Sequence, residues 1–415
     1  MQARLDTLCR VISQALDVVE AEVFGSTERH SLRVAALCAA MGRRLGYDDD
    51  HLMALAIGAM FHDCALTEYV LSERNGVQGG KNLRLHCEKG QHNIRYLPLK
   101  HKPEGYILYH HEYGDGSGTF GLKMGEYPIE AELIALADRA DVSSRLQSLP
   151  VEDVVRVRER AESLRGIHYS STSIDAFLAI FDEDMLPSLR DHAIDATLDA
   201  AIPRLHVDLA DPAIIHIADF VARIIDYKSV FTKQHTNQIA YRTYLMCDHY
   251  GYDDTQKGLM YLAAGLHDLG KIRTPTSILE KPGRLDPDEF DVIREHVLHT
   301  HDWLRGVPGF DDICRWASNH HEKLDGSGYP FGLCAADLDF NSRLLGCMDI
   351  YQAVSEERPY HPRRSHEEAM EIMYDMAKEG KIDSEITRDI DLIMKPWSQK
   401  DVPAPAAVNF ASSDF

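Results

Sequence analysis

Two adjacent histidines, His320 and His321, stand directly before a glycine-rich segment with the sequence Glu-Lys-Leu-Asp-Gly-Ser-Gly-Tyr-Pro. They follow an apolar run of helical periodicity, and the Asp-Gly-Ser-Gly residues after them favour a tight loop. Neighbouring residues on a helix point about 100° apart, so the two rings can face one centre only near a helix end. The pair indicates two ligands of one metal centre, although surface or capping histidines explain these two residues equally simply.

Residues of the same types recur along the chain in a fixed order. The first set is His30, His62, Asp63, His86, His110, His111 and Asp138. The second set is His235, His267, Asp268, His296, His320, His321 and Asp349. Corresponding members are 205 residues apart at the start of the sets, 210 in the middle and 211 at the end. This ordered repetition predicts two copies of one domain.

Most of the chain has the spacing of apolar residues that is typical of amphipathic helices, and few segments alternate as strands do. We therefore predict an all-α protein with one domain at residues 1–185 and a second at residues 205–398. Residues 186–204 are expected to connect the two domains and to be partly helical. Residues 399–415 are expected to form a disordered tail.

Local sequence also predicts where several helices begin and end. Asp211-Pro212 and Asp286-Pro287 each combine an N-cap residue with proline at the first helical position. Leu259–Leu266 is apolar nearly all round, so we expect a core helix that ends in His267-Asp268-Leu269-Gly270-Lys271. Gly270 would then serve as the C-terminal cap of this helix.

The five imidazoles and two carboxylates of the second set suit a pair of transition-metal ions such as iron or manganese. Asp268 is the natural bridging ligand, because histidines flank it on both sides. One ion would be bound by His235, His267, Asp268 and Asp349, and the other by Asp268, His296, His320 and His321. Two ions about 3.5–4 Å apart can share a hydroxide and clamp a phosphoryl group. The ordered set carries this prediction, because a His-Asp pair by itself is weak and also occurs at His301-Asp302.

Lys271 follows the His267-Asp268 pair by three residues. Its ammonium group would point at a non-bridging phosphate oxygen in such a centre. An exposed lysine is an equally simple interpretation of this residue by itself.

Composition limits the classes of partner. The formal net charge is −22, so duplex nucleic acid is not expected, and an anionic ligand needs a local positive centre such as bound metal. The eight cysteines show no CxxC spacing and indicate reduced thiols in a cytoplasmic protein. The longest apolar run, Leu52–Phe61, is too short for a membrane span, and the N-terminus lacks the apolar core of a signal peptide.

Residues 205–398 resemble the HD-GYP family of the HD superfamily, and nearly the whole second half takes part in the match. The motifs that carry the resemblance are His267-Asp268-Leu269-Gly270-Lys271, His320-His321-Glu322, Asp325-Gly326-Ser327-Gly328-Tyr329-Pro330 and Arg358-Pro359-Tyr360. The resemblance implies a helical, metal-dependent phosphodiesterase that opens cyclic di-GMP or 3′,3′-cyclic GMP-AMP. It implies that the second set of residues binds the metals and that Lys271 and Arg358 hold phosphate. It also implies that Gly328, Tyr329 and Pro330 border the substrate.

The whole chain resembles the tandem subgroup in which an HD domain precedes the HD-GYP domain. Members of the family with three metals carry a glutamate four residues before the first histidine, where this chain has Phe231. We therefore expect two metal ions in the second copy.

The first copy keeps all seven ligand positions but has Leu66 at the lysine position and Thr119-Phe120 in place of Tyr-Pro. No Arg-Pro-Tyr follows it. Three hypotheses fit this pattern: a metal centre that hydrolyses a smaller phosphate ester, such as a linear dinucleotide or a mononucleotide; a regulatory metal centre; or a structural relic. For the whole protein, the rival to an enzyme is a receptor that binds a cyclic dinucleotide and signals to a partner.

Overall fold

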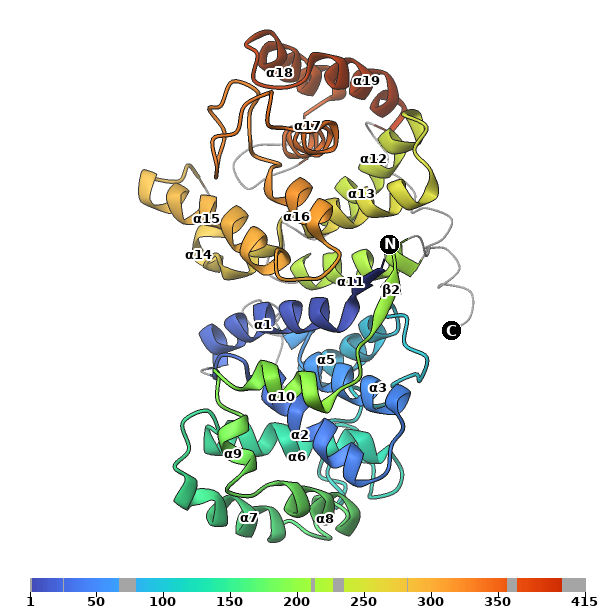
Figure 1. Ribbon diagram of the computed structural model, residues 1–415, viewed down its shortest axis with the longest axis vertical. Coiled ribbons are helices and arrows are strands. Elements are labelled where there is room, and N and C mark those ends of the chain that lie inside the picture. Colours follow the sequence, from blue (N-terminus) through green and yellow to red (C-terminus); the bar gives the residue numbers. More distant parts are fainter. Residues whose placement is uncertain are drawn as a thin grey trace. The chain divides into compact units, whose positions relative to one another are not determined.

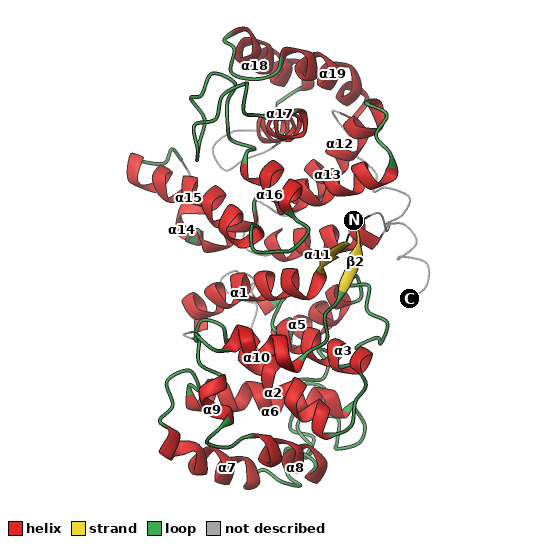
Figure 2. Cartoon of the chain, viewed as in Figure 1, coloured by secondary structure: helices red, strands yellow, loops and turns green. Residues whose placement is uncertain are grey.

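The computed structural model describes residues 2–24, 26–66, 80–209, 213–226, 235–281, 283–356 and 364–397. It divides into two compact units, which we call the N-terminal unit (Leu5–Leu205) and the C-terminal unit (His206–Phe415 together with Met1–Arg4). Nearly all regular structure in the described residues is helical (Figure 2), which confirms the expected all-α class with two HD-type copies. Within the described residues, none of the helices has both the length and the apolar character needed to cross a membrane.

The N-terminal unit is built around α2, which is buried along most of its length. It contacts α1, α3, α6, α8 and α10. The helices of this unit are α1 (Leu5–Phe24), α2 (His30–Arg44), α3 (Asp49–Met60), α5 (Gly80–Ile94), α6 (Ile129–Ser144), α7 (Val154–Glu162), α8 (Ser171–Ile180), α9 (Met185–Ser188) and α10 (Ile194–Ala201), with a 3-10 turn at Val151–Asp153.

Residues 186–204, expected to connect the two copies, fold as part of the N-terminal unit. Helix α10 lies in this segment and packs against α2. Two ion pairs hold it: Arg29 Nη1 lies 2.7 Å from Asp195 Oδ2, and Arg10 Nη1 lies 2.7 Å from Asp199 Oδ1. The compact part of the first half therefore continues to Leu205.

In the C-terminal unit, helices pack around α17 (Figure 1). This unit also contains the two short strands of the described structure. Strands β1 (Gln2–Arg4) and β2 (His206–Asp208) pair antiparallel, with Ala3 opposite Val207. The helices are α11 (Ala213–Asp226), α12 (His235–His249), α13 (Asp254–Leu266), α14 (Thr276–Leu279), α15 (Pro287–Leu304), α16 (Asp311–Ser318), α17 (Phe340–Ser355), α18 (His366–Lys378) and α19 (Ser384–Met394), with 3-10 turns at Leu269–Arg273 and Lys395–Trp397.

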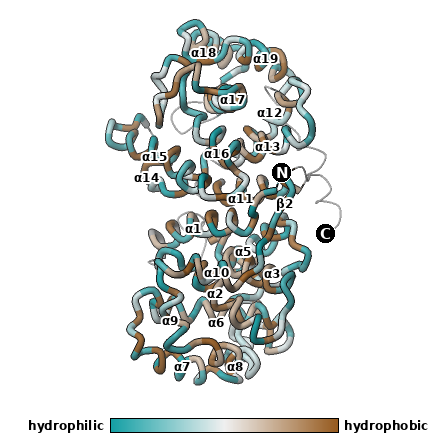
Figure 3. The backbone as a smooth tube through the Cα atoms, in the orientation of Figure 1, coloured by the Kyte–Doolittle hydropathy of each residue, from teal (hydrophilic) through white to brown (hydrophobic). Residues whose placement is uncertain are grey.

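The predicted start of α15 and the predicted core helix α13 agree with the structure, although α13 ends earlier than predicted. Asp286 caps α15 in a reciprocal capping box with Glu289, and Pro287 is the first helical residue. Helix α13 is buried from Gly258 onward and ends at Leu266, directly before His267-Asp268. Polar and apolar residues alternate along outer helices such as α15 and α18 (Figure 3), as amphipathic helices require.

The prediction for Gly270 was wrong. This residue lies inside the 3-10 turn Leu269–Arg273 and not at a left-handed cap. Its lack of a side chain serves packing instead, because a Cβ atom there would lie 1.9 Å from the carbonyl oxygen of His296 in α15.

Two other predictions fall on residues outside the described part of the structure: the Asp211-Pro212 helix start and the disordered tail 399–415. All eight cysteines are free thiols, and seven of them are buried.

Candidate metal centres

The C-terminal centre is assembled from the ends of two helices and the sides of two others. His267 and Asp268 follow α13, and His320 and His321 follow α16, while His296 lies in α15 and Asp349 in α17. Gly270 and Gly346 allow this convergence, since a Cβ atom at either would press on the backbone oxygen of His296 or His320.

Asp268 lies between the histidines, as the sequence predicted. Its Oδ2 is 3.3 Å from Nε2 of His267, and its Oδ1 is 3.3 Å from Nε2 of His296 and 4.0 Å from Nε2 of His320. Each carboxylate oxygen therefore faces a different group of imidazoles, which is the arrangement of a bridging ligand.

Asp349 closes the other side of the C-terminal centre. Its Oδ1 lies 3.8 Å from Nε2 of His267, and its Oδ2 lies 3.5 Å from Nδ1 of His321. Two sets of ligand atoms lie within 4.8 Å of one another: His267, Asp268 and His320, and His296, His320 and His321. His320 belongs to both sets.

Backbone hydrogen bonds fix which ring nitrogen of each histidine is available. The Nδ1 atoms of His267, His296 and His320 lie 2.6 Å from the carbonyl oxygens of Ala264, Ile293 and Ala317. A carbonyl oxygen only accepts, so Nδ1 carries the proton and a neutral ring presents the lone pair of Nε2 to the centre. This is the second contact that orients metal-binding histidines in proteins.

Electrostatics keep His320 and His321 neutral and Asp268 ionised, whereas the pKa of His267 is raised because the charge of Asp268 outweighs the effect of burial. Burial lowers the pKa of His320 to about 3, helped by the charge of His267, and burial with the charge of His320 lowers the pKa of His321 well below its usual range. Burial would raise the pKa of Asp268, but His267 and Lys271 outweigh it and hold the pKa well below its usual range. His320, His321 and Asp268 are thus in the protonation states that metal ions require.

Lys271 reaches into this centre. Its Nζ lies 2.5 Å from Oδ2 of Asp268, and its side chain is 17% exposed. The Asp268–Lys271 pair therefore has one buried member and one member that a ligand can approach.

The glycine-rich loop is held over the centre by Glu322, whose role sequence reasoning missed. Its two oxygens accept from the backbone N–H groups of Phe331 (2.7 Å) and Leu333 (2.9 Å). Gly328 passes so close to this glutamate that a Cβ atom there would lie 2.4 Å from its Cα. The loop places the ring of Tyr329 4.8 Å from the ring of His321, between centroids.

Arg294 was also missed. Its guanidinium carbon lies 4.7 Å from the centroid of the Tyr329 ring, so it brings a cation to the rim of the centre. A signal was present in the sequence, because Arg84 and Glu112 stand 210 residues before Arg294 and Glu322.

Two predicted site residues cannot be placed. His235 is the first residue of α12, but its side chain lies outside the described structure. Arg358 lies outside the described residues altogether, as does Phe231. Pro330 follows Tyr329 in the loop described above.

The N-terminal centre repeats the arrangement around Asp268. Oδ2 of Asp63 lies 3.4 Å from Nε2 of His62, and Oδ1 lies 2.9 Å from Nε2 of His86 and 3.5 Å from Nε2 of His110. The Nδ1 atoms of His62 and His110 again donate to carbonyl oxygens three residues earlier, those of Ala59 and Ile107. Two sets of ligand atoms within 4.8 Å of one another form: His30, His62 and Asp138, and His86, Cys87, His110 and His111.

The buried ring nitrogens of the N-terminal centre give a direct test of whether a cation fits. Within the described residues, the Nε2 atoms of His62, His86 and His110 form no hydrogen bond, although all three converge on Asp63. Buried polar atoms are nearly always paired. A cation bound between these nitrogens and the carboxylate satisfies all of them, so the residues fit a metal centre.

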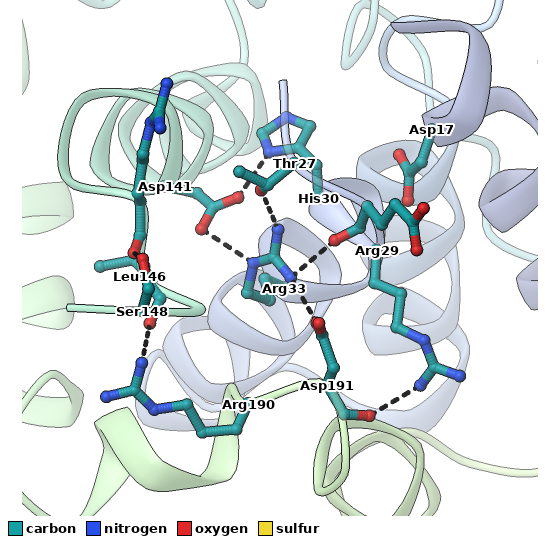
Figure 4. Close-up of polar contacts among 12 residues, drawn as sticks. Asp17, Thr27, Arg29, His30, Arg33, Asp141, Leu146, Ser148, Arg190 and Asp191 are labelled. Carbon is teal, nitrogen blue, oxygen red and sulfur yellow. Dashed lines mark hydrogen bonds and ion pairs between the residues drawn. The ribbon is translucent and has the colours of Figure 1, made fainter. Parts of the chain in front are cut away.

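His30 is held by a buried ionic network (Figure 4). Its Nδ1 lies 2.7 Å from Oδ2 of Asp141, and its Nε2 lies 3.4 Å from Oδ1 of Asp138. The fully buried Arg33 donates to Oδ1 of Asp141 (2.9 Å) and to Asp191 (3.1 Å). Asp191 lies in the 186–204 segment, so this segment helps to orient a predicted ligand.

A cavity of about 460 Å³ opens beside the N-terminal centre. Its lining includes His30, Asp63, His111 and Asp138, and Leu66 stands where the C-terminal unit has Lys271. Glu20 from α1 also lines it. The N-terminal unit thus joins an accessible space to its predicted ligands.

Comparison with known proteins agrees with this architecture. Family models of the HD domain match residues 27–143 and residues 219–386. The 3′3′-cGAMP-specific phosphodiesterase 1 of Vibrio cholerae is 29% identical over 403 residues, which are 94% of this chain and 90% of that protein. The cyclic di-GMP phosphodiesterase response regulator RpfG of Xanthomonas campestris is 31% identical over 164 residues, which are 39% of this chain and 43% of that protein.

A solved structure shares the fold. The crystal structure of a cyclic GMP-AMP specific phosphodiesterase of V. cholerae (V-cGAP3) matches with a TM-score of 0.65 and 20% identity, covering 95% of this chain and 98% of that one. The chain contains two HD domains, the second of which carries the His-Asp and Gly-Tyr-Pro motifs, and it belongs to the HD superfamily in its tandem HD and HD-GYP form.

Proposed function

We propose that the C-terminal unit hydrolyses a 3′–5′ phosphodiester bond of a cyclic dinucleotide. Water adds to phosphorus, the bond from phosphorus to O3′ breaks, and the product is a linear dinucleotide with a 5′-phosphate. The observation that carries the proposal is the convergence of Asp268, Asp349 and the imidazoles on one centre, with Lys271 2.5 Å from Asp268.

In this proposal, two divalent ions, iron or manganese, are held by His235, His267, Asp268, His296, His320, His321 and Asp349. When bound, they supply a hydroxide nucleophile and neutralise phosphate charge. The Lys271 side chain is partly exposed, so its ammonium group would donate to a non-bridging phosphate oxygen. Arg358 is proposed to hold the second phosphate.

The substrate is proposed to lie against the loop of Gly328, Tyr329 and Pro330. The Tyr329 ring offers a stacking surface for a purine, and Arg294 behind it reinforces the positive charge at this rim. 3′,3′-Cyclic GMP-AMP is the first substrate to test, because the relative that matches nearly the whole chain is specific for it. Cyclic di-GMP is the alternative, since a shorter match is to an enzyme for that nucleotide.

We further propose that the N-terminal unit binds metal through His30, His62, Asp63, His86, His110, His111 and Asp138 but does not open cyclic dinucleotides. The three ring nitrogens without hydrogen bonds support metal binding. Leu66 supports the second part, because an apolar side chain cannot contact phosphate as Lys271 would. The eight free thiols support a cytoplasmic location.

The experiment uses the full-length protein reconstituted with Mn²⁺ or, anaerobically, with Fe²⁺. Each cyclic dinucleotide is supplied and linear products are separated by chromatography, while metal per chain is measured by elemental analysis. We expect a linear 5′-phosphorylated product and its loss in Asp268→Asn. Tight nucleotide binding without turnover under either metal would favour the receptor hypothesis instead, and release of inorganic phosphate from a 5′-nucleotide that depends on Asp63 would assign hydrolysis to the N-terminal unit.

A further inference from the structure

Glu20 occupies a core position of α1 although it is charged. It follows Leu8, Ile12 and Leu16 at four-residue spacing, so it continues the buried face of the helix. Its side chain is only 5% exposed. It lines the cavity that also contains His30, Asp63 and Asp138.

Within the described residues, Glu20 forms no hydrogen bond and no ion pair. Burial and the negative charges of Asp63, Asp17 and Asp138 all act against its ionised form, and His30 opposes them only partly. An unpaired buried carboxylate is costly, by several kcal/mol in order of magnitude. Protonation of the side chain or a bound cation would offset that cost.

Asp17, one turn earlier on the same helix, shows the contrast. It is equally buried, but its Oδ1 accepts from the N–H of Ser31 at 3.1 Å and from the Ser31 hydroxyl at 2.6 Å, at the start of α2. The burial of Asp17 is therefore explained by helix capping. The burial of Glu20 is not.

A second observation points to the missing partner. Ligand atoms of His30, His62 and Asp138 lie within 4.8 Å of one another, and Nε2 of His62 is buried there without a hydrogen bond among the described residues. Glu20 is not part of this set at that distance but lines the same cavity as His30 and Asp138. A divalent cation would satisfy the imidazole and all the carboxylates at once.

We propose that Glu20 is a metal ligand of the N-terminal centre and binds the cation held by His30, His62 and Asp138. The proposal rests on metal binding by this unit, as put forward above. Two imidazoles and two carboxylates suit Mn²⁺ or Fe²⁺. The second copy lacks this ligand, because the matching position, 205 residues later, is the buried, apolar Ile225.

The ligand changes the charge of one centre relative to the other. The N-terminal unit gains the carboxylate of Glu20 and loses the ammonium of Lys271 to Leu66, so its centre is two charges more negative. Such a centre holds its cation more tightly and attracts phosphate less. The N-terminal unit is therefore built to retain metal, and the C-terminal unit to bind an anion.

The test uses the full-length protein with His267→Ala and Asp268→Asn, so that the N-terminal centre alone is intact. After chelation, Mn²⁺ is titrated and free ion is followed by electron paramagnetic resonance. We expect Glu20→Gln to weaken Mn²⁺ binding about tenfold or more, because loss of a residue that only supports a ligand already costs that much. The matched control Asp17→Asn should bind within about twofold of the parent, and Asp63→Asn should lose binding.

Unfolding in chelator separates a ligand from a structural residue. Metal-free Glu20→Gln should melt at or above the parent, because it removes a repelled carboxylate, and should lose the rise in Tm that Mn²⁺ gives the parent. A metal-free Tm below the parent, or unchanged Mn²⁺ affinity while Asp63→Asn loses it, would overturn the role of Glu20. If Asp63→Asn also binds as the parent does, the N-terminal metal centre itself is wrong.

Discussion

The two units hold nearly the same set of imidazoles and carboxylates but surround it differently. In both, a central aspartate offers Oδ2 to one histidine and Oδ1 to two others. In both, a glutamate holds the following loop by two backbone N–H groups: Glu112 those of Phe120 and Leu122, and Glu322 those of Phe331 and Leu333. The scaffold of the centre is therefore independent of the residues that would meet a substrate.

The two units differ in the residues that surround the predicted ligands. Arg84 lies 4.8 Å from the Phe120 ring, whereas Arg294 lies 4.7 Å from the Tyr329 ring beside the metal-binding histidines. The backbone N–H of Thr119 bonds to the His111 carbonyl as that of Tyr329 bonds to the His321 carbonyl, so Thr119 takes the place of the tyrosine. The N-terminal loop keeps its path and loses its aromatic ring at this position.

The two units also differ where the helix that carries His296, or its counterpart His86, packs against the turn that follows the His-Asp pair. In the C-terminal unit, Gly270 donates its N–H to Thr300 Oγ1 at 2.9 Å, and that hydroxyl donates to the His267 carbonyl at 3.1 Å. In the N-terminal unit the corresponding residues are Ala65 and Gly90. The glycine is therefore in the turn in the C-terminal unit and in the helix in the N-terminal unit. The two units thus position their metal ligands by different packing.

The largest expected effect separates the two central aspartates. Asp268→Asn should lower the rate of cyclic dinucleotide opening by about 10³-fold or more, since a bridging ligand supports several kcal/mol of charge stabilisation. Asp63→Asn should leave that rate within about threefold, while lowering the metal content. Initial rates and elemental analysis on the same preparations check this, and equal loss of rate in both variants would break the proposed division of labour.

Lys271 and Leu66 provide the next test. Lys271→Leu, which copies the N-terminal unit, should lower kcat by about 10²-fold because one phosphate contact is lost. Lys271→Arg should recover part of this loss. The reverse change, Leu66→Lys, should not create ring-opening activity in a protein that carries Asp268→Asn. Steady-state kinetics measure all three, and an unchanged kcat in Lys271→Leu would remove the lysine from the mechanism.

Gly270→Ala should destabilise the C-terminal unit by about 1–3 kcal/mol, because the new Cβ would lie 1.9 Å from the His296 carbonyl oxygen and α15 must move. A shift of His296 should also lower activity, by about tenfold. The matched change Ala65→Gly should cost less than about 1 kcal/mol. Chemical unfolding with activity assays tests this pair, and comparable losses in the two variants would contradict the packing argument.

The smallest effect on activity concerns Asp219, which is buried in α11 and accepts from the Tyr261 hydroxyl at 2.5 Å. Burial raises the pKa of Asp219 to about 6, opposed by Tyr261 and Arg223. Because the folded pKa lies above the unfolded value, the native state binds the proton more tightly, and stability falls as pH rises from about 4 to 6.

Asp219→Asn should remove this dependence, since an amide oxygen can still accept from Tyr261. The variant should therefore gain on the natural protein by about 2 kcal/mol between pH 4.5 and pH 7.5. Unfolding of the C-terminal unit at the two pH values measures the gain, with the N-terminal unit as an internal control. An equal difference between variant and natural protein at both pH values would show that Asp219 titrates normally.

The helical class could be predicted from sequence, as could the residues that the structure brings together from the two sets, because both depend on residue type and spacing alone. The role of Gly270 could not, because a local rule for helix caps cannot show that α15 passes over it. Glu20 was missed for a related reason: its spacing on α1 marks a core position, but only the fold shows that this position faces His30 and Asp138. Arg294 and Glu322 also recur in the repeat, but the prediction was based only on its histidines and aspartates.

Strand β1 has a consequence for biosynthesis. Residues 2–4 leave the ribosome early, yet their partners are residues 206–208, and Arg4 donates to the carbonyl of Pro308. The C-terminal unit is thus a discontinuous domain into which the N-terminal unit is inserted, and its sheet can close only after residues 206–208 have been translated. In a nascent chain, the N-terminal unit should therefore fold first, and β1 should pair with β2 afterwards.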